Sequence, residues 1–295
     1  MRSILQNLID GLGNGSTYAL LAVGVSMLFG VMHLVNFAHG ELLTVAAYVT
    51  YALRSHNVSW FIVVPLSIAA AVALSVVIEF AAFRRLRSAS PFTLLLTSFA
   101  IEILSHSVWR IGVSQKPRRW EQPNLVFKQF RWAGLRIEWF DLISIAVAVI
   151  CLLLTALMLK KTLFGLAIRA ASEDFDAARL MGVRANRVIS GAFAFAGLLA
   201  GIAGALFLAR RGQADPRMGA EPLLKAVIAA IIGGLGSLKG AVIGGLALGV
   251  AEVYFRSLLP SDLKGLTDGF VFVLIAILFV VRPQGLFNVA NAERV

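Results

Sequence analysis

An apolar run of membrane-spanning length, GLGNGSTYALLAVGVSMLFGVMHLVNFAHGE from Gly11 to Glu41, ends abruptly in polar residues. A second apolar run, Leu42 to Leu53, follows at once. A helix over this second run would be only about 18 Å long, well short of the roughly 30 Å hydrocarbon core of a bilayer. The polar break at 36–41 is therefore predicted to lie at membrane depth, where irregular backbone must be buried in protein or line a cavity. Such a break is typical of a pathway through a membrane protein.

The composition agrees with a membrane protein. The chain is 59% hydrophobic and only 15% charged, whereas soluble domains of this length carry far more charge. Its net charge of +11 indicates basic loops that set topology and meet anionic membrane lipid, and no nucleic-acid partner is predicted. The single cysteine, Cys151, excludes a disulfide within the chain.

The apolar runs predict an all-α, polytopic transmembrane helix bundle in which residues 1–295 form a single domain. Membrane segments are expected at 16–33, 42–54, 60–83, 91–111, 140–160, 188–209, 223–257 and 267–282. As one helix the seventh run would measure about 52 Å, too long for one span. GGLGSLKG (Gly233–Gly240) interrupts it, so two short helices are expected, giving about eight to nine segments with discontinuous helices. The glycine-rich stretches Gly197–Gly204 and Gly240–Gly249 predict close helix packing within the bundle.

Short basic loops predict the orientation. Phe83–Ser90 and the segment 161–187 are rich in arginine and lysine, which places both in the cytoplasm. The segment 112–139 is predicted to be an external loop containing a small hairpin in VFKQFRWAGLRIEW. The protein is thus expected to be a multi-pass protein of the cell (inner) membrane, with its N-terminus outside and its C-terminus in the cytoplasm.

Ionisable residues inside apolar runs are costly, by about 2.5–3.5 kcal/mol each at the bilayer centre, so they are expected to face the bundle or to be functional. We expect Glu79 to pair with Arg84 and Arg85 near the interface, and Glu102 to hydrogen-bond His106 one helical turn away. The sequence leaves open whether Glu252 supports packing or faces a cavity.

The predicted translocation path runs along the two breaks, the polar one at 36–41 and the glycine-rich one at Gly233–Gly240. Its residues are Asn36, Phe37, His39, Gly40, Glu41, Gly233, Gly234 and Gly236. His39 and Glu41 could bind a metal or relay protons, but two ligands without an HExxH motif or a cysteine pair are weak evidence. A break stabilised by local side-chain hydrogen bonds is favoured, and no metal site is predicted.

The cytoplasmic segment TLFGLAIRAASEDFDAARLMGVRANR is amphipathic. A short helix with an alanine-rich face outside the membrane is suited to docking into a groove on another protein, and this interpretation is favoured over a solvated linker. The chain contains no phosphate-loop motif, no nucleophile elbow and no metalloprotease motif, so energy must come from a gradient or from another subunit.

Five stretches occur in order along nearly the whole chain: GNGSTYALLAVGVSMLFGVMHLVNFAHGEL, Glu79 with Arg84-Arg85-Leu86-Arg87, FGLAIRAASEDFDAARLMGV, IIGGLGSLKGAVIGG and RPQGLF. They resemble successive motifs of the permease subunits of branched-chain amino-acid ABC importers, and the pattern is closer to the shorter of the two paralogous permeases. Two features depart from the family. Arg85 stands where a proline is frequent, and Lys116–Phe130 is unusually basic, which bears on the identity of the docking protein.

The resemblance implies a pore-forming, non-enzymatic subunit that works with a paralogous permease, two ATP-binding subunits and an extracytoplasmic substrate-binding protein. ATP would be used by the partner subunits, and this chain would bind no cofactor. The segment Ser172–Gly182 would be the coupling helix. The residues expected to contact the ATPase are Arg169, Glu173, Asp176, Ala177, Ala178, Arg179, Leu180 and Gly182.

Three classes of function remain open at this point. The first is an ABC importer permease for branched-chain or other small amino acids, or alternatively for urea or short amides. The second is a stand-alone secondary transporter or channel in which Glu41, Glu102 or Glu252 carries protons. The third is a membrane scaffold without transport. The amphipathic cytoplasmic segment and the family motifs favour the first.

Overall fold

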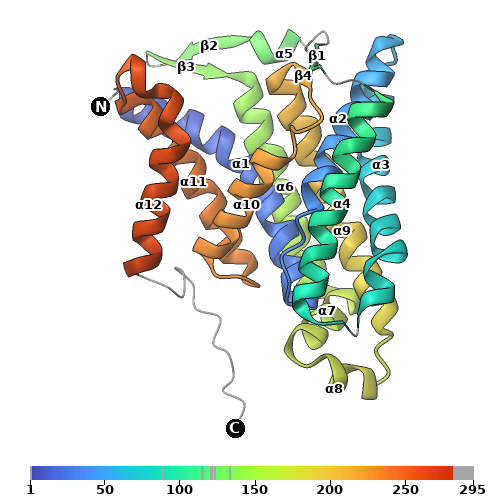
Figure 1. Cartoon of the computed structure of the whole chain (residues 1–295). Helices are drawn as coiled ribbons and strands as arrows, with labels where there is room; N and C mark the ends of the chain where they lie inside the picture. The colour runs from blue at the N-terminus through green and yellow to red at the C-terminus, as the bar shows by residue number, and fades with distance from the viewer. Residues whose placement is uncertain are drawn as a thin grey trace.

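The computed structural model describes residues 2–87, 89–113, 116–119, 122, 124–132 and 134–281. They form a helical bundle with two very small sheets (Figure 1). The helices are α1 (Arg2–Met32), α2 (His39–Ser55), α3 (Trp60–Ala81), α4 (Pro91–Gly112), α5 (Asn124–Phe127), α6 (Trp139–Lys161), α7 (Leu163–Glu173), α8 (Phe175–Leu180), α9 (Ala185–Arg211), α10 (Ala220–Gly233), α11 (Leu238–Leu258) and α12 (Thr267–Val281). Two 3₁₀ turns, η1 (Phe83–Leu86) and η2 (Ser261–Leu266), and the strands β1 (Arg118–Arg119), β2 (Gln129–Trp132), β3 (Leu135–Glu138) and β4 (Gln213–Ala214) complete the fold.

In the part of the chain that the structure describes, each predicted membrane run is helical over most of its length. Among the described residues, six helices are long and apolar enough to cross a membrane, and they lie within α1, α3 with η1, α4, α6, α9 and α11. The seventh run is divided into α10 and α11, as its glycines predict. The first helix starts well before residue 16, the predicted start of the first run. Its polar first turns are stabilised by partners outside the helix, since Gln6 Nε2 donates to the carbonyl oxygen of Arg136 at 2.7 Å.

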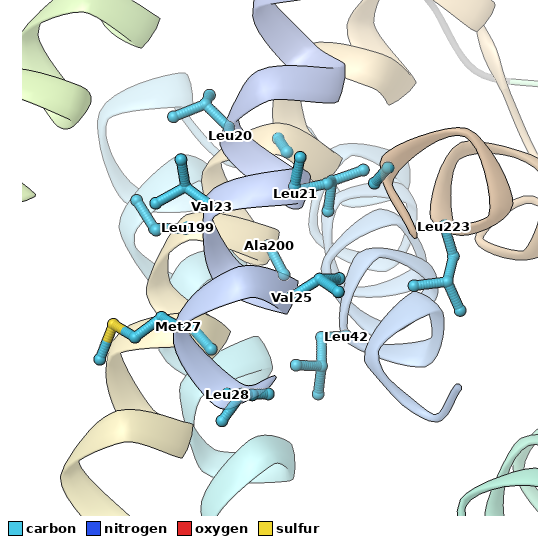
Figure 2. Packing of buried hydrophobic residues seen from close by; sticks show 14 of the residues in the cluster. Leu20, Leu21, Val23, Val25, Met27, Leu28, Leu42, Leu199, Ala200 and Leu223 are labelled. Atoms are coloured by element: carbon cyan, nitrogen blue, oxygen red, sulfur yellow. The ribbon is translucent and has the colours of Figure 1, made fainter. Parts of the chain in front are cut away.

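The core is centred on α1, which packs against α6, α9, α10 and α11. Figure 2 shows Leu20, Leu21 and Val25 of α1 among Leu42, Leu199, Ala200 and Leu223. The contact with α11 is made by backbone. A Cβ built on Gly249 would lie 2.3 Å from the Cα of Gly15, and one on Gly245 would lie 2.5 Å from the Cα of Ala19. Close packing through these glycines is therefore confirmed.

The hairpin and the amphipathic segment lie at opposite ends of the bundle (Figure 1). Strands β2 and β3 pair antiparallel from Gln129 opposite Glu138 to Trp132 opposite Leu135, so the predicted hairpin is present. Strand β1 pairs with β4 close to it. Helices α7 and α8 form the other end, and the basic turn after α3 lies beside them, because Arg87 donates to Asn186 at the start of α9. Which end faces the cytoplasm remains a prediction.

Candidate translocation site

The first residue of α2, His39, is fully buried in the middle of the bundle. A Cβ on Gly24 of α1 would lie 2.9 Å from His39 Nε2 and 3.6 Å from the carbonyl oxygen of Ala196 in α9. Gly24 is about 12 Å along the helix from the end of α1, and Ala196 about 16 Å from the start of α9. The chain therefore turns back into the bundle after α1, and the break at 36–41 lies deep inside it.

Local hydrogen bonds hold the break, as the sequence predicts. Asn36 Oδ1 accepts from the backbone N–H of Ala38 at 3.1 Å, and His33 turns the chain in the left-handed region with φ 53°. Within the described residues no three His, Cys, Asp or Glu side chains come together as a metal site, and neither ring nitrogen of His39 has a hydrogen-bond partner there.

The break meets a second helix start that the sequence analysis missed. A Cβ on Gly219, directly before α10, would lie 2.0 Å from the carbonyl oxygen of Gly40, and one on Gly40 would lie 2.8 Å from that of Gly219. Only glycine at both positions allows this approach. The sequence did carry a pattern common to both helix starts: a glycine followed closely by a glutamate, Glu41 or Glu221, precedes each apolar run.

Two side chains at the break contact α4. Glu41 is buried, and its Oε2 accepts from Trp109 Nε1 at 3.1 Å. Phe37 stacks on Phe99 with ring centroids 4.1 Å apart. The break is thus enclosed by α1, α4, α9 and α10.

The glycines predicted to complete this path lie elsewhere. Gly233, Gly234 and Gly236 form the turn between α10 and α11, with φ 94° at Gly234 and φ 84° at Gly236. This turn is at the opposite end of α10 from Gly219, about 20 Å away along the helix. The structure therefore does not bring the two predicted groups into one site. The reason is that α10 runs as one continuous helix between them.

Glu252, whose role the sequence left open, belongs to a buried ion cluster. Its Oε2 lies 3.2 Å from Lys225 Nζ and accepts from the hydroxyl of Tyr18 at 2.8 Å. Lys225 also lies 2.9 Å from Glu221 Oε1 and 3.0 Å from Asp268 Oδ1. The sequence analysis did not single out Lys225, although a lysine inside the run 223–257 was a visible signal.

Two expected pairings need correction. Glu79 is fully buried and pairs with Arg84, at 3.5 Å, and with Arg87, while the predicted partner Arg85 is exposed. The turn η1 has about three residues per turn, which directs the side chains of Arg84 and Arg87 to the same face. The partner of His106 is Arg217, whose Nε donates to His106 Nε2 at 3.1 Å, and not the Glu102 expected from the helical spacing.

The coupling segment consists of two helices, where one was expected. Arg169 and Glu173 are exposed on α7, and Asp174 interrupts the helix, its Oδ1 accepting from the N–H of Ala177 at 2.9 Å. Asp176, Ala177, Ala178, Arg179 and Leu180 lie in α8, and Gly182 follows it with φ 86°.

The apolar surface of this segment differs from the predicted alanine face. Ala178 is buried, whereas Leu180 is 89% exposed and Met181 85% exposed. The surface available to a partner is therefore that of Leu180 and Met181. The motif RPQGLF and the predicted cytoplasmic C-terminus fall within 282–295, outside the described residues.

Comparison with known proteins adds to this geometry. A family model described as "Branched-chain amino acid transport system / permease component" matches residues 7–281. The high-affinity branched-chain amino acid transport system permease protein BraD of Pseudomonas aeruginosa is 30% identical, over 99% of this chain and 98% of its own length. Proteins of the same description named LivH, from Salmonella typhimurium and Escherichia coli K12, are 32% and 31% identical, each over 99% of this chain and 97% of their own length. No solved structure matches the chain.

Proposed function

Because this chain belongs to the permease components of branched-chain amino acid transport systems, we propose that it forms the pore of an ABC importer for branched-chain or other small amino acids. The observation that carries the proposal is the position of α8. It leaves Leu180 and Met181 almost fully exposed, and α9 starts only a few residues later and passes the break.

In this proposal the partners supply the energy and the selectivity. Two ATP-binding subunits bind and hydrolyse ATP, so this chain carries no cofactor of its own. A paralogous permease completes the pore in the inner membrane, and an extracytoplasmic substrate-binding protein delivers the amino acid. Leu180 and Met181 insert into a groove on one ATPase, with Arg169, Glu173 and Arg179 at the rim of the contact.

The ion cluster at Glu79 is suited to transmit movement of α8 into the bundle. Ser190, in the second turn of α9, donates to Glu79 Oε2 at 2.8 Å, and Arg87 bridges Glu79 and Asn186. The start of α9, the end of α3 and the turn before α4 are thereby joined through side chains. When α8 is displaced by ATPase closure, α9 and the α3–α4 hairpin move together around the break.

The test is reconstitution in liposomes with the candidate ATPases, paralogous permease and binding protein. Leu180→Gln should lower binding-protein-stimulated ATP hydrolysis and amino-acid uptake by about tenfold, because an exposed apolar contact with the ATPase is lost. Leu163→Gln is the matched control, since Leu163 is 85% exposed on α7 and lies outside the proposed contact. Normal stimulation in Leu180→Gln with full assembly would disprove docking through α8.

Uptake assays in the same liposomes test which substrates are transported. Uptake of leucine, isoleucine and valine is expected to depend on the binding protein and ATP, and competition by urea or acetamide is expected to be absent. Strong competition by these amides would favour the alternative substrate class.

A further inference from the structure

Helix α4 has two faces of different character. The outer face is apolar, and each of its large side chains is more than half exposed: Phe92, Leu96, Ile103, Leu104, Val108 and Ile111. The face toward α2 carries Ser98, which is buried, and Glu102, Ser105 and His106, which are partly buried. We call these four residues the polar stripe of α4. Because polar groups at membrane depth avoid lipid, the apolar face is the lipid side and the polar stripe faces protein or water.

Helix α4 packs less closely against the bundle than α1 does. Only 11% of the apolar stretch of α4 is buried, against 83% for α1. Side-chain contacts hold α4 to the bundle near its polar stripe, among them the Phe37–Phe99 stack, the Trp109–Glu41 hydrogen bond and the Arg217–His106 hydrogen bond. Glu102 and Ser105 are partly exposed between these contacts.

Polar groups of other elements meet the polar stripe. The backbone N–H of Arg217 donates to Asp215 Oδ1 at 2.7 Å, which fixes the loop that presents the guanidinium to His106. Tyr48 of α2 stacks on Trp109 with ring centroids 5.0 Å apart. Its hydroxyl is buried, and none of the described residues is its hydrogen-bond partner. A buried hydroxyl without a hydrogen-bond partner is usually satisfied by a bound water molecule or a polar ligand.

We propose that the polar stripe of α4, together with Tyr48 and Arg217, is a water-exposed wall of the translocation path, which we call the wet wall. Arg217 receives the carboxylate of the passing amino acid, and Glu102 receives its ammonium group. His106 lies between them, one helical turn from Glu102 and hydrogen-bonded to Arg217. A zwitterion that leaves water needs both charges balanced, and this wall supplies one cation and one carboxylate. This inference rests on the proposed importer function.

Thiol labelling tests the wall without requiring transport. In a Cys151→Ala background, single variants Glu102→Cys and Ser105→Cys are compared with Ile103→Cys and Leu104→Cys, their neighbours on the lipid side. A membrane-impermeant cationic methanethiosulfonate should label the first pair at least about tenfold faster, because it reacts only with thiols that water reaches. Leucine with its binding protein should slow the labelling. Equal rates in the two pairs, or labelling of neither, would overturn the proposal.

Uptake tests the two charges. Arg217→Gln and Glu102→Gln should each lower leucine uptake about tenfold while binding-protein-stimulated ATP hydrolysis continues. Arg85→Gln, an exposed arginine of η1, is the control and should leave uptake unchanged. Unchanged uptake in both test variants would refute the assigned roles. If no variant and no wild-type protein shows ATP-dependent uptake while the labelling pattern holds, the importer function fails and the wet wall stands.

Discussion

The Nζ of Lys225 lies 3.2 Å from Oε2 of Glu252, and the two side chains are only 3% and 5% exposed. The same ammonium group lies 3.0 Å from Asp268 Oδ1. One lysine on α10 therefore holds a carboxylate of α11 and another of α12.

Replacing this lysine should be strongly destabilising. Lys225→Met leaves the buried Glu252 carboxylate without its nearest cation, and breaking a buried pair from one side costs about 3–5 kcal/mol. We expect a clear fall in the melting temperature of the purified protein in detergent. The double variant Lys225→Met/Glu252→Gln removes both charges and should recover most of the loss. A double variant less stable than the single one would contradict this account.

The Glu79 cluster gives a second stability prediction. Glu79→Gln leaves Arg84 and Arg87 without the carboxylate between them, and the loss should again be about 3–5 kcal/mol. The control is Arg85→Gln, which changes an exposed side chain of the same turn and should alter stability by less than about 0.5 kcal/mol. Unfolding of the detergent-solubilised protein measures the stability of both variants. Similar losses in the two variants would mean that Glu79 has no special role.

The glycine contact between α1 and α11 is expected to tolerate no side chain. In Gly249→Ala the new methyl group meets the backbone of Gly15 at 2.3 Å, so the helices must separate, at a cost of about 1–3 kcal/mol. Gly269→Ala in α12 is the matched control, because nothing lies within 4 Å of its added Cβ. Thermal unfolding of both variants checks the difference, and a Gly249→Ala protein as stable as wild type would show that the contact can relax.

Replacing Glu41 with a neutral residue distinguishes an ATP-driven importer from a proton-coupled transporter. In Glu41→Gln the side-chain amide oxygen can still accept from Trp109, so the break should keep its shape. If ATP drives transport, uptake should remain within about threefold of wild type, since no proton transfer is removed. Uptake should also resist a protonophore. Loss of uptake in the variant together with protonophore sensitivity would favour a proton-coupled transporter.

Much of the fold could be predicted from hydropathy because apolar runs separated by polar breaks leave the chain few options in a membrane. The break at 36–41 followed from its polar residues and the short apolar run after it, and the division of 223–257 followed from its length together with its glycines. The start of α1 could not be predicted in this way, because its polar turns depend on a distant partner, the backbone of Arg136.

The errors at the candidate sites have the same origin. Helical spacing pointed from His106 to Glu102, but it says nothing about Arg217, which arrives from a loop more than one hundred residues away. The approach of Gly219 to Gly40 is likewise a tertiary contact between two helix starts. The alanine face of 161–187 was misjudged because the interruption at Asp174 turns Ala178 inward.

The central position of α1 has a consequence for how the protein is made. This helix is synthesised before α9, α10 and α11, which pack against it and follow about 150 to 225 residues later. At about 5–20 residues per second, α1 must wait on the order of ten seconds or more for these partners. During that time Gly15, whose final neighbours are Gly245 and Leu246 of α11, has not met them. We therefore expect α1 to reach its final packing only after α11 has been synthesised, long after the helix itself.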